Sequence, residues 1–228
     1  MKLSIIIPVY NEESTIEKLI SQIEEINIEK ELIIVDDGSF DQTSEILKFL
    51  KKKHNFILLT HAENQGKGAA IQTALKHIRG ELVIIQDADL ETKPDNYPKL
   101  IEPIVDGKAK VVYGARIRSF KNLNLILKVY FLGGKFLTWL ANLLFGSNLA
   151  DINSPCKLFR TEILKNLNLQ SKGFDIDFEI TAKILKQNYS LIEIPIPYFP
   201  RTIKEGKKIR MKDGLKGALA LIRYRFGD

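Results

Sequence analysis

The chain has 228 residues, 45% of them hydrophobic and 27% charged, which suits one globular domain with a large buried core. Its single cysteine, Cys156, excludes an internal disulfide framework. Because Cys/His spacings for zinc are also missing, we expect a cytoplasmic protein. The formal net charge of +6 favours anionic partners, either phosphorylated small molecules or lipid headgroups. We expect no nucleic-acid partner, because Glu205 and Asp213 interrupt the basic C-terminal residues and no nucleic-acid motif accompanies them.

The first 115 residues alternate short apolar runs with segments of helical periodicity, which is typical of βαβ units and a parallel sheet. The predicted strands are Leu3 to Val9, Glu31 to Val35, Phe56 to Thr60, Leu82 to Gln86 and Lys110 to Gly114. The predicted helices between them are Glu12 to Glu25, Thr43 to Lys53, Lys67 to Ile78 and Asn96 to Val105. The first apolar run is too short for a signal-peptide core or a membrane span, so we expect it to be the first strand.

A strongly apolar region follows, from about Leu123 to Gly146. Lysines, glycines and an asparagine interrupt it, so it predicts one or two amphipathic helices rather than a membrane span. Such helices either lie on a bilayer or pack on the core of the sheet, and the sequence leaves both open. Beyond Asp151 the α/β pattern returns, with helices near Thr161 to Leu167 and Phe178 to Gln187, a strand at Ser190 to Ile194 and a basic tail.

The predicted strand at Leu82 to Gln86 ends in Asp87-Ala88-Asp89. Residues two apart on an extended strand point the same way, so the two carboxylates can converge on one hard cation. Left unpaired, they would repel each other and raise each other's proton affinity. The pattern therefore predicts a Mg²⁺ or Mn²⁺ site that keeps open positions for substrate phosphates.

Other polar clusters also follow predicted strands, at the carboxyl ends where ligands bind in doubly wound sheets. Asp36-Asp37-Gly38-Ser39 can accept hydrogen bonds from a base or a ribose, although it is also an ordinary turn sequence. Gly66-Lys67-Gly68 opens a helix and can let a phosphate approach backbone N–H groups. The chain lacks the glycine-rich spacings of Walker loops and dinucleotide-binding folds, which counts against an ATPase or a dehydrogenase.

Taken in order, four motifs resemble the family 2 glycosyltransferases of the GT-A fold: IIPVYNE at 6–12, VDDGS at 35–39, NQGKG at 64–68 and DAD at 87–89. Later segments are similar to the polyprenyl-phosphate and dolichyl-phosphate hexose synthases, so the resemblance covers nearly the whole chain. It implies an α/β fold with a Rossmann-like, mostly parallel sheet, flanking helices and amphipathic interface helices. It also implies one domain over 1–228, with a nucleotide-sugar-binding half at 1–115, interface helices at 116–150, and an acceptor-side half with a basic C-terminal loop at 151–228.

The resemblance further implies roles for individual residues. Those expected at the nucleotide sugar are Pro8, Tyr10, Glu12, Val35, Asp37, Lys67, Asp87, Ala88, Asp89, Arg201 and Lys207. Asp87 and Asp89 would bind the metal, with Glu91 as a third ligand where relatives often have Gln. Arg116 and Lys128 would contact the acceptor phosphate. Arg201 and Lys207 would close over the donor diphosphate. The expected catalytic residues are Asp89, Arg116, Lys128, Arg201 and Lys207.

Two positions depart from the family pattern. Lys128 stands where some relatives carry Arg, and lysine binds phosphate as a point charge rather than as a bidentate fork. Ser154-Pro155-Cys156 replaces a Gly-Phe-like pair. The local backbone there and any role of Cys156 therefore stay open.

The implied reaction is an inverting transfer of mannose or glucose, from GDP-mannose or UDP-glucose, to a polyprenyl or dolichyl phosphate. A phosphomonoester has a second pKa of about 6, so this acceptor is already ionised and needs no catalytic base. The lipid acceptor would explain the apolar 123–146 region, which would bring the active site to the cytoplasmic face of a membrane. This predicts a peripheral membrane protein. The sequence leaves open whether a membrane-protein partner exists.

Three other functions compete with this one. A family 2 enzyme that builds a cell-surface glycan would act on a sugar hydroxyl and would need a base, for which Asp151, Asp175 and Asp177 are candidates. A sugar-phosphate nucleotidyltransferase also uses a parallel sheet and metal-binding acids, but the segment 8–12 stands where its Gly-rich basic loop would be. A non-catalytic membrane scaffold would not need Asp87 and Asp89.

Overall fold

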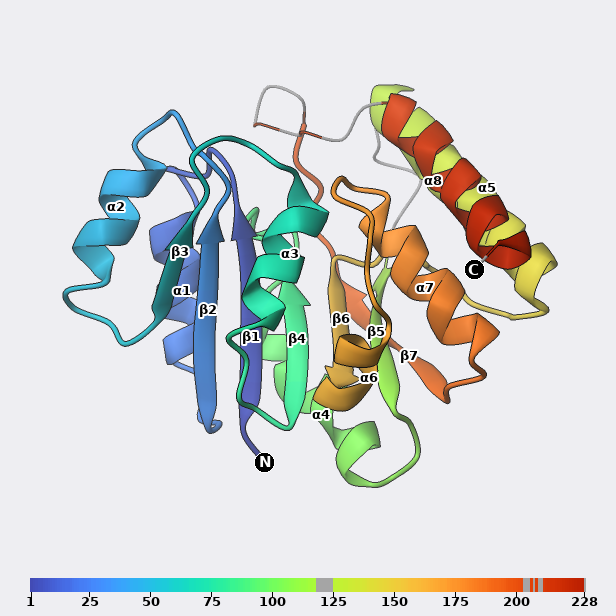
Figure 1. Cartoon of the computed structure of the whole chain (residues 1–228), viewed down its shortest axis with the longest axis horizontal. Helices are drawn as coiled ribbons and strands as arrows, with labels where there is room; N and C mark the ends of the chain where they lie inside the picture. The colour runs from blue at the N-terminus through green and yellow to red at the C-terminus, as the bar shows by residue number, and fades with distance from the viewer. Residues whose placement is uncertain (118–124, 203–205, 207, 209–210, 228) are drawn as a thin grey trace.

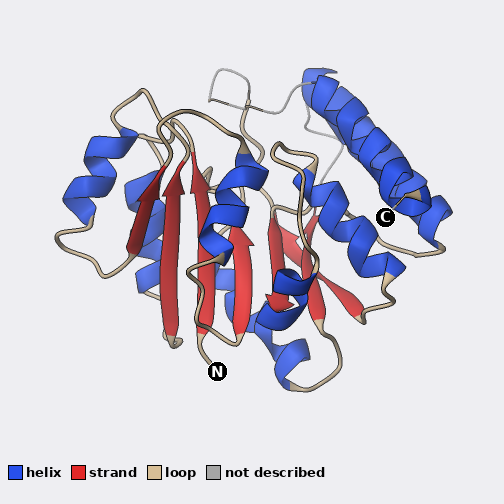
Figure 2. Cartoon of the chain, in the orientation of Figure 1, coloured by secondary structure: helices blue, strands red, loops and turns tan. Residues whose placement is uncertain are grey.

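The computed structural model describes residues 1–117, 125–202, 206, 208 and 211–227 (Figure 1). The short apolar runs of the sequence form the centre of the molecule as one sheet, with helices on both of its faces (Figure 2). The sheet has seven strands in the order β3-β2-β1-β4-β6-β5-β7. Their bounds are β1 Leu3–Val9, β2 Lys30–Asp36, β3 Ile57–Thr60, β4 Leu82–Gln86, β5 Val111–Ile117, β6 Cys156–Arg160 and β7 Leu191–Pro197.

Parallel pairing brings the ends of the central strands to one edge of the sheet. Leu3 of β1 lies opposite Lys30 of β2 and opposite Leu82 of β4, and all three strands run the same way. Strand β6 alone among these strands is antiparallel to both of its neighbours, β4 and β5. The expected mostly parallel α/β sheet is therefore confirmed.

The helices form two layers because their buried faces match the alternating side chains of the strands. On one face, α1 (Ile16–Glu24), α2 (Thr43–Leu50) and α4 (Tyr97–Val105) cover a core of Ile, Leu and Val. A short 3-10 turn, η1 (Pro94–Asn96), precedes α4. On the other face, α3 (Lys67–Leu75), α6 (Thr161–Asn166) and α7 (Ile176–Lys186) cover a second core.

A pair of helices, α5 (Leu125–Phe145) and α8 (Met211–Phe226), packs outside α7 and extends the molecule on one side (Figure 1). A third core joins the three helices, and its members include Leu137, Ala141, Phe178 and Leu221. The predicted apolar region thus forms one long helix in its described part. In the described residues no helix is both long enough and apolar enough to cross a membrane.

Strand β6 and helix α8 were not predicted. In β6, Lys157 interrupts a short apolar run, yet it lies 1% exposed in the middle of the sheet. Helix α8 begins within the expected basic tail, and its two glycines, Gly214 and Gly217, and several basic residues hide the helical pattern. Gly217 has a packing reason, because a Cβ atom built there would lie 2.4 Å from the ring of Phe178.

Candidate active site

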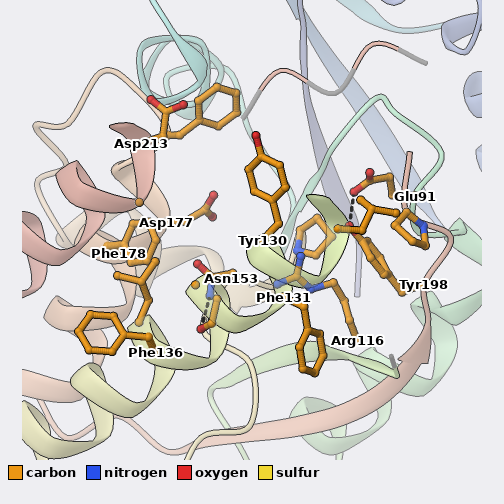
Figure 3. A pocket seen from close by; sticks show the side chains of 18 of the residues that line it. Glu91, Arg116, Tyr130, Phe131, Phe136, Asn153, Asp177, Phe178, Tyr198 and Asp213 are labelled. Atoms are coloured by element: carbon orange, nitrogen blue, oxygen red, sulfur yellow. Dashed lines mark hydrogen bonds between the residues drawn. The ribbon is translucent and has the colours of Figure 1, made fainter. Parts of the chain in front are cut away.

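A cavity of about 640 Å³ opens between the carboxyl edge of the sheet and the helices α5 and α8. Its charged lining residues include Lys67, Asp87, Asp89, Glu91, Arg116 and Asp177. Much of the remaining lining is apolar or aromatic and comes from the two outer helices. In Figure 3, Arg116, Tyr198 and Glu91 gather on one side of this space, and Phe136 and Phe178 lie on the other.

The deepest part of the site is a buried charge chain, by which we mean Lys157, Asp177, Lys67 and Asp87. The ammonium of Lys157 lies 2.7 Å from Oδ1 of Asp177, and that of Lys67 lies 3.0 Å from Oδ2 of the same carboxylate. Lys67 is also 2.8 Å from Oδ1 of Asp87. Burial opposes the ionisation of Asp177, but Lys157 and Lys67 outweigh it and lower the pKa of Asp177 to about 2.

Asp89 lies at the same edge, and its ion pair is a longer one. Among the described residues its recorded partner is Arg201, whose Nη2 is 3.7 Å from Oδ2 of Asp89. Burial, together with the charges of Asp87 and Glu91, raises the pKa of Asp89 to about 7. Two neighbouring buried carboxylates suit a divalent cation, so Asp87 and Asp89 fit the predicted metal pair.

Glu91, the expected third ligand, has hydrogen-bond partners of its own in this structure. Its carboxylate accepts hydrogen bonds from the hydroxyl of Tyr198 at 2.6 Å and from the backbone N–H of Arg201 at 2.7 Å. Within the described residues, no three His, Cys, Asp or Glu side chains form a group that could hold a metal ion. Glu91 instead fastens the segment after β7 to the loop after β4.

Glu12 and Arg201 make a second connection to that segment. The guanidinium of Arg201 donates to both carboxylate oxygens of Glu12, at 2.9 and 3.0 Å, and Lys208 also donates to Glu12. The donor-binding residues predicted at the two ends of the chain thus come together, and in this state they bind each other. Lys207 lies outside the described residues.

Asp37, an expected contact of the nucleotide, is bound by groups of its own chain. Its carboxylate accepts hydrogen bonds from His61, from Asn64 and from the backbone N–H groups of Gln65 and Gly66, all between 2.6 and 2.9 Å. A carboxylate with two donors on each oxygen is well satisfied. Asp37 therefore fixes the turn that leads into α3 and so positions Lys67.

The other residues predicted to bind the nucleotide sugar fall into two groups, one buried and one half-buried. The side chains of Val35 and Ala88 lie in the cores of the sheet and are 0% and 3% exposed, so only their backbone atoms could meet a ligand. Pro8 and Tyr10 are half-buried at the carboxyl end of β1. The ring of Tyr10 packs edge-on against Phe40, with 6.1 Å between the ring centroids.

Arg116 lies in the cavity, but not as a free cation. Its Nε and Nη2 donate to the two carboxylate oxygens of Asp151 at 2.6 and 2.7 Å, and its guanidinium stacks 5.1 Å from the ring centroid of Tyr198. Lys128, the expected second contact to the acceptor phosphate, is half-buried on α5 and is not among the residues that line the cavity. Of the two predicted acceptor residues, Arg116 is therefore the one that lines the cavity.

Sequence reasoning missed the part played by Lys157. A lysine inside an otherwise apolar strand was the available signal, because a buried lysine needs a charged partner. Cys156, its neighbour, is 0% exposed, and burial raises the pKa of its thiol to about 12. Such a thiol is inert, which answers the question that the sequence left open.

Two outer rows of exposed apolar side chains run along α5 and α8, three or four positions apart as helical geometry requires. On α5 the row is Val129, Leu132, Phe136, Trp139 and Leu143, and on α8 it is Leu215, Leu219, Ile222 and Phe226. Val129, Phe136 and Leu215 also line the cavity. The apolar end of the cavity is therefore continuous with the outer rows.

Residues 4–167 match the sequence profile of glycosyl transferase family 2. A UDP-N-acetylglucosamine–dolichyl-phosphate N-acetylglucosaminyltransferase of Methanococcus voltae is 32% identical, and the alignment covers 98% of this chain and 96% of the relative. A dolichol-phosphate mannosyltransferase of Pyrococcus furiosus is 30% identical over 91% of this chain and 59% of the relative. A dolichyl-phosphate β-glucosyltransferase of Trichomonas vaginalis is 30% identical over 97% and 72%.

Among solved structures, glucosyl-3-phosphoglycerate synthase from Mycobacterium tuberculosis has a similar fold. The superposition has a TM-score of 0.75 at 20% identity and covers 100% of this chain and 81% of that protein. Structures of that synthase contain Mg²⁺ or Mn²⁺ together with uridine diphosphate. The matched profile, the relatives and the sheet with its Asp87-Ala88-Asp89 edge agree, and the chain belongs to glycosyl transferase family 2.

Proposed function

We propose that this glycosyltransferase moves a hexose or N-acetylhexosamine from a nucleoside diphosphate sugar to a polyprenyl phosphate at a membrane face. The observation that carries the proposal is the mixed lining of the cavity. It joins the charged Asp87, Asp89 and Arg116 to apolar side chains of α5 and α8 that continue into the outer rows. A phosphate joined to a long hydrocarbon chain has the same two-part character.

The charged groups of the site also favour a phosphate over a hydroxyl as the acceptor. A hydroxyl must lose its proton to a base during attack, whereas a phosphomonoester is already ionised near neutral pH. Asp177 is bound by two lysines, and its pKa of about 2 makes it a weak base. Asp151 is engaged by Arg116, and Asp175 is not among the residues that line the cavity.

The donor diphosphate would lie at the carboxyl edge of the sheet. Asp87 and Asp89 would hold the Mg²⁺ or Mn²⁺, which when bound neutralises charge on the departing diphosphate. Arg201 would leave Glu12 to bind the diphosphate, as its place 3.7 Å from Asp89 allows. Lys207 would add a second cation, and Arg116 would reduce the repulsion between acceptor phosphate and donor.

The outer rows would seat the enzyme on the bilayer. Interfacial helices carry an apolar face and flanking basic residues, and α8 has the exposed Lys212, Lys216 and Arg223 beside its row. With the cavity opening beside Val129, Phe136 and Leu215, an acceptor phosphate could enter while its chain stays in the lipid.

The decisive experiment offers several donors and matched acceptors. Purified protein with Mn²⁺ is incubated with UDP-glucose, UDP-N-acetylglucosamine or GDP-mannose, each with a short polyprenyl phosphate or with the corresponding polyprenol, and products are identified by mass spectrometry. We expect glycosyl transfer to the polyprenyl phosphate from one donor and none to the polyprenol. Transfer to a polyprenol or sugar hydroxyl, with no product from the phosphate, would refute the proposal.

A further inference from the structure

Lys67 is shared between two carboxylates at the centre of the buried charge chain. Its ammonium lies 2.8 Å from Oδ1 of Asp87 and 3.0 Å from Oδ2 of Asp177, and its side chain is 8% exposed. A cation held so closely stabilises Asp87 as an anion while no metal is bound. A divalent cation at Asp87 would bring two further positive charges next to this ammonium.

Those two cations would repel each other at Asp87. We propose that Lys67 is the resting counter-ion of Asp87, and that a divalent cation bound by Asp87 and Asp89 displaces it onto Asp177. The inference rests on the proposed function, because it takes the metal pair from it. Lys67 would stay paired throughout, since it already contacts Asp177 and has only to give up its contacts to Asp87.

Lys157 sets how strongly Asp177 attracts Lys67. Its ammonium donates to Oδ1 of Asp177 at 2.7 Å and to the backbone oxygen of Ser154 at 2.6 Å, and the side chain is 1% exposed. One oxygen of Asp177 thus serves each lysine. Lys157 thus weakens the attraction of Asp177 for Lys67, so Asp177 and Lys157 act as positioning residues for Asp87.

The exchange predicts the sign of each change in metal affinity. The measurement is the Mn²⁺ dissociation constant, obtained from the electron paramagnetic resonance signal of free Mn²⁺ without nucleotide or lipid. Lys67→Met should tighten Mn²⁺ binding by about tenfold, because no ammonium then competes with Mn²⁺ for Asp87. Lys157→Met should tighten it by a similar factor, because Asp177 then attracts Lys67 away from Asp87 more strongly. Asp177→Asn should weaken binding by about tenfold, because Lys67 then has only Asp87.

A double variant separates the exchange from a simple effect of net charge. Asp177→Asn with Lys157→Met keeps the net charge of the wild type and leaves no buried lysine without a partner, so the fold is preserved. Net charge alone predicts unchanged Mn²⁺ affinity, whereas the exchange predicts affinity weaker by about tenfold, since Lys67 has lost its alternative carboxylate. Lys108→Met, at an exposed pair with Asp106, is the matched control and should leave the affinity unchanged.

Wild-type affinity in the double variant would overturn the exchange. Weaker binding in all the variants of the buried charge chain would do the same, because it would mean general damage to the site. Undetectable Mn²⁺ binding in every variant would also overturn it. Glycolipid formation is assayed separately. If the lipid-acceptor proposal fails, the changes in Mn²⁺ affinity still test the exchange.

Discussion

Asp89 shows at the scale of one residue how a group suited to binding can be unfavourable for folding. Burial and the neighbouring carboxylates of Asp87 and Glu91 raise its pKa to about 7, and Arg201 at 3.7 Å offsets only part of this. Without a bound cation, ionising Asp89 therefore works against the folded state. Such a cost is common at functional sites, where the ligand removes it.

We expect Asp89→Asn to lose glycosyl transfer and to gain stability in EDTA at pH 8. The pKa of Asp89 lies above its ordinary value of 3.8, so the folded protein binds the proton more tightly than the unfolded chain. The free energy of unfolding then falls as pH rises from about 4 to 7. Because asparagine stays neutral, the variant should be more stable by roughly 1–3 kcal/mol at pH 8 and by a smaller amount at pH 5, where the wild type has passed through only part of that range. Urea unfolding of both proteins at both pH values tests this, and equal stability at pH 8 would contradict it.

The motifs predicted which residues gather at the site better than they predicted the bonds those residues make. Asp87, Asp89, Arg116 and Lys67 all line one cavity, as their positions after strands indicated. Asp37 faces four donors of its own chain instead of open space. A motif fixes where a carboxylate lies along a strand, but the donors around it come from distant segments that a local pattern does not contain.

At the scale of elements, the bounds of helices and strands were predicted best where one pattern of apolar residues extended over the whole segment. The strands β1 and β4 have the predicted bounds, because each is a continuous buried apolar run between polar loops. Helix α1 begins at Ile16 rather than at Glu12, since Glu12 faces Arg201 and lies before the first turn. Helix α8 escaped prediction because its inner face is partly glycine, which tertiary packing requires and local propensity disfavours.

Gly217 gives a direct test of that packing. A methyl group at this position would lie 2.4 Å from Cε2 of Phe178, so Gly217→Ala should force the buried ring or the helix to move. We expect a loss of roughly 1–3 kcal/mol in the free energy of unfolding. Gly214→Ala is the matched control, because its Cβ would meet only Leu137 Cδ1 at 4.0 Å, and it should be neutral or slightly stabilising. Urea unfolding measures both, and equal stability of the two variants would show that the contact at Gly217 has no effect.

At the scale of the whole molecule, the sheet and the outer helices have separate tasks that meet at the cavity. The carboxyl edge of the sheet gathers the charged residues, and α5 and α8 add an apolar wall whose outer side is exposed (Figure 1). An isolated exposed Leu or Phe is ordinary on a protein surface, but two helical rows beside a cavity mouth are not. This arrangement is what joins sugar transfer to a lipid surface in the proposed function.

The outer row of α5 should therefore be needed for binding to vesicles but not for folding. In a variant with Leu132→Ser, Trp139→Ser and Leu143→Ser, none of the changed residues is buried, so we expect little change in the free energy of unfolding. Removing this much exposed apolar area should lower co-sedimentation with anionic phospholipid vesicles by about tenfold or more. Because none of the three residues lines the cavity, transfer to a short, dispersed polyprenyl phosphate should persist.

Phe49→Ser with Val105→Ser, which removes exposed apolar side chains from α2 and α4, is the control and should bind vesicles normally. Equal loss in both variants would mean that the vesicles respond to general surface hydrophobicity, and undiminished binding of the α5 variant would place the membrane contact elsewhere on the molecule.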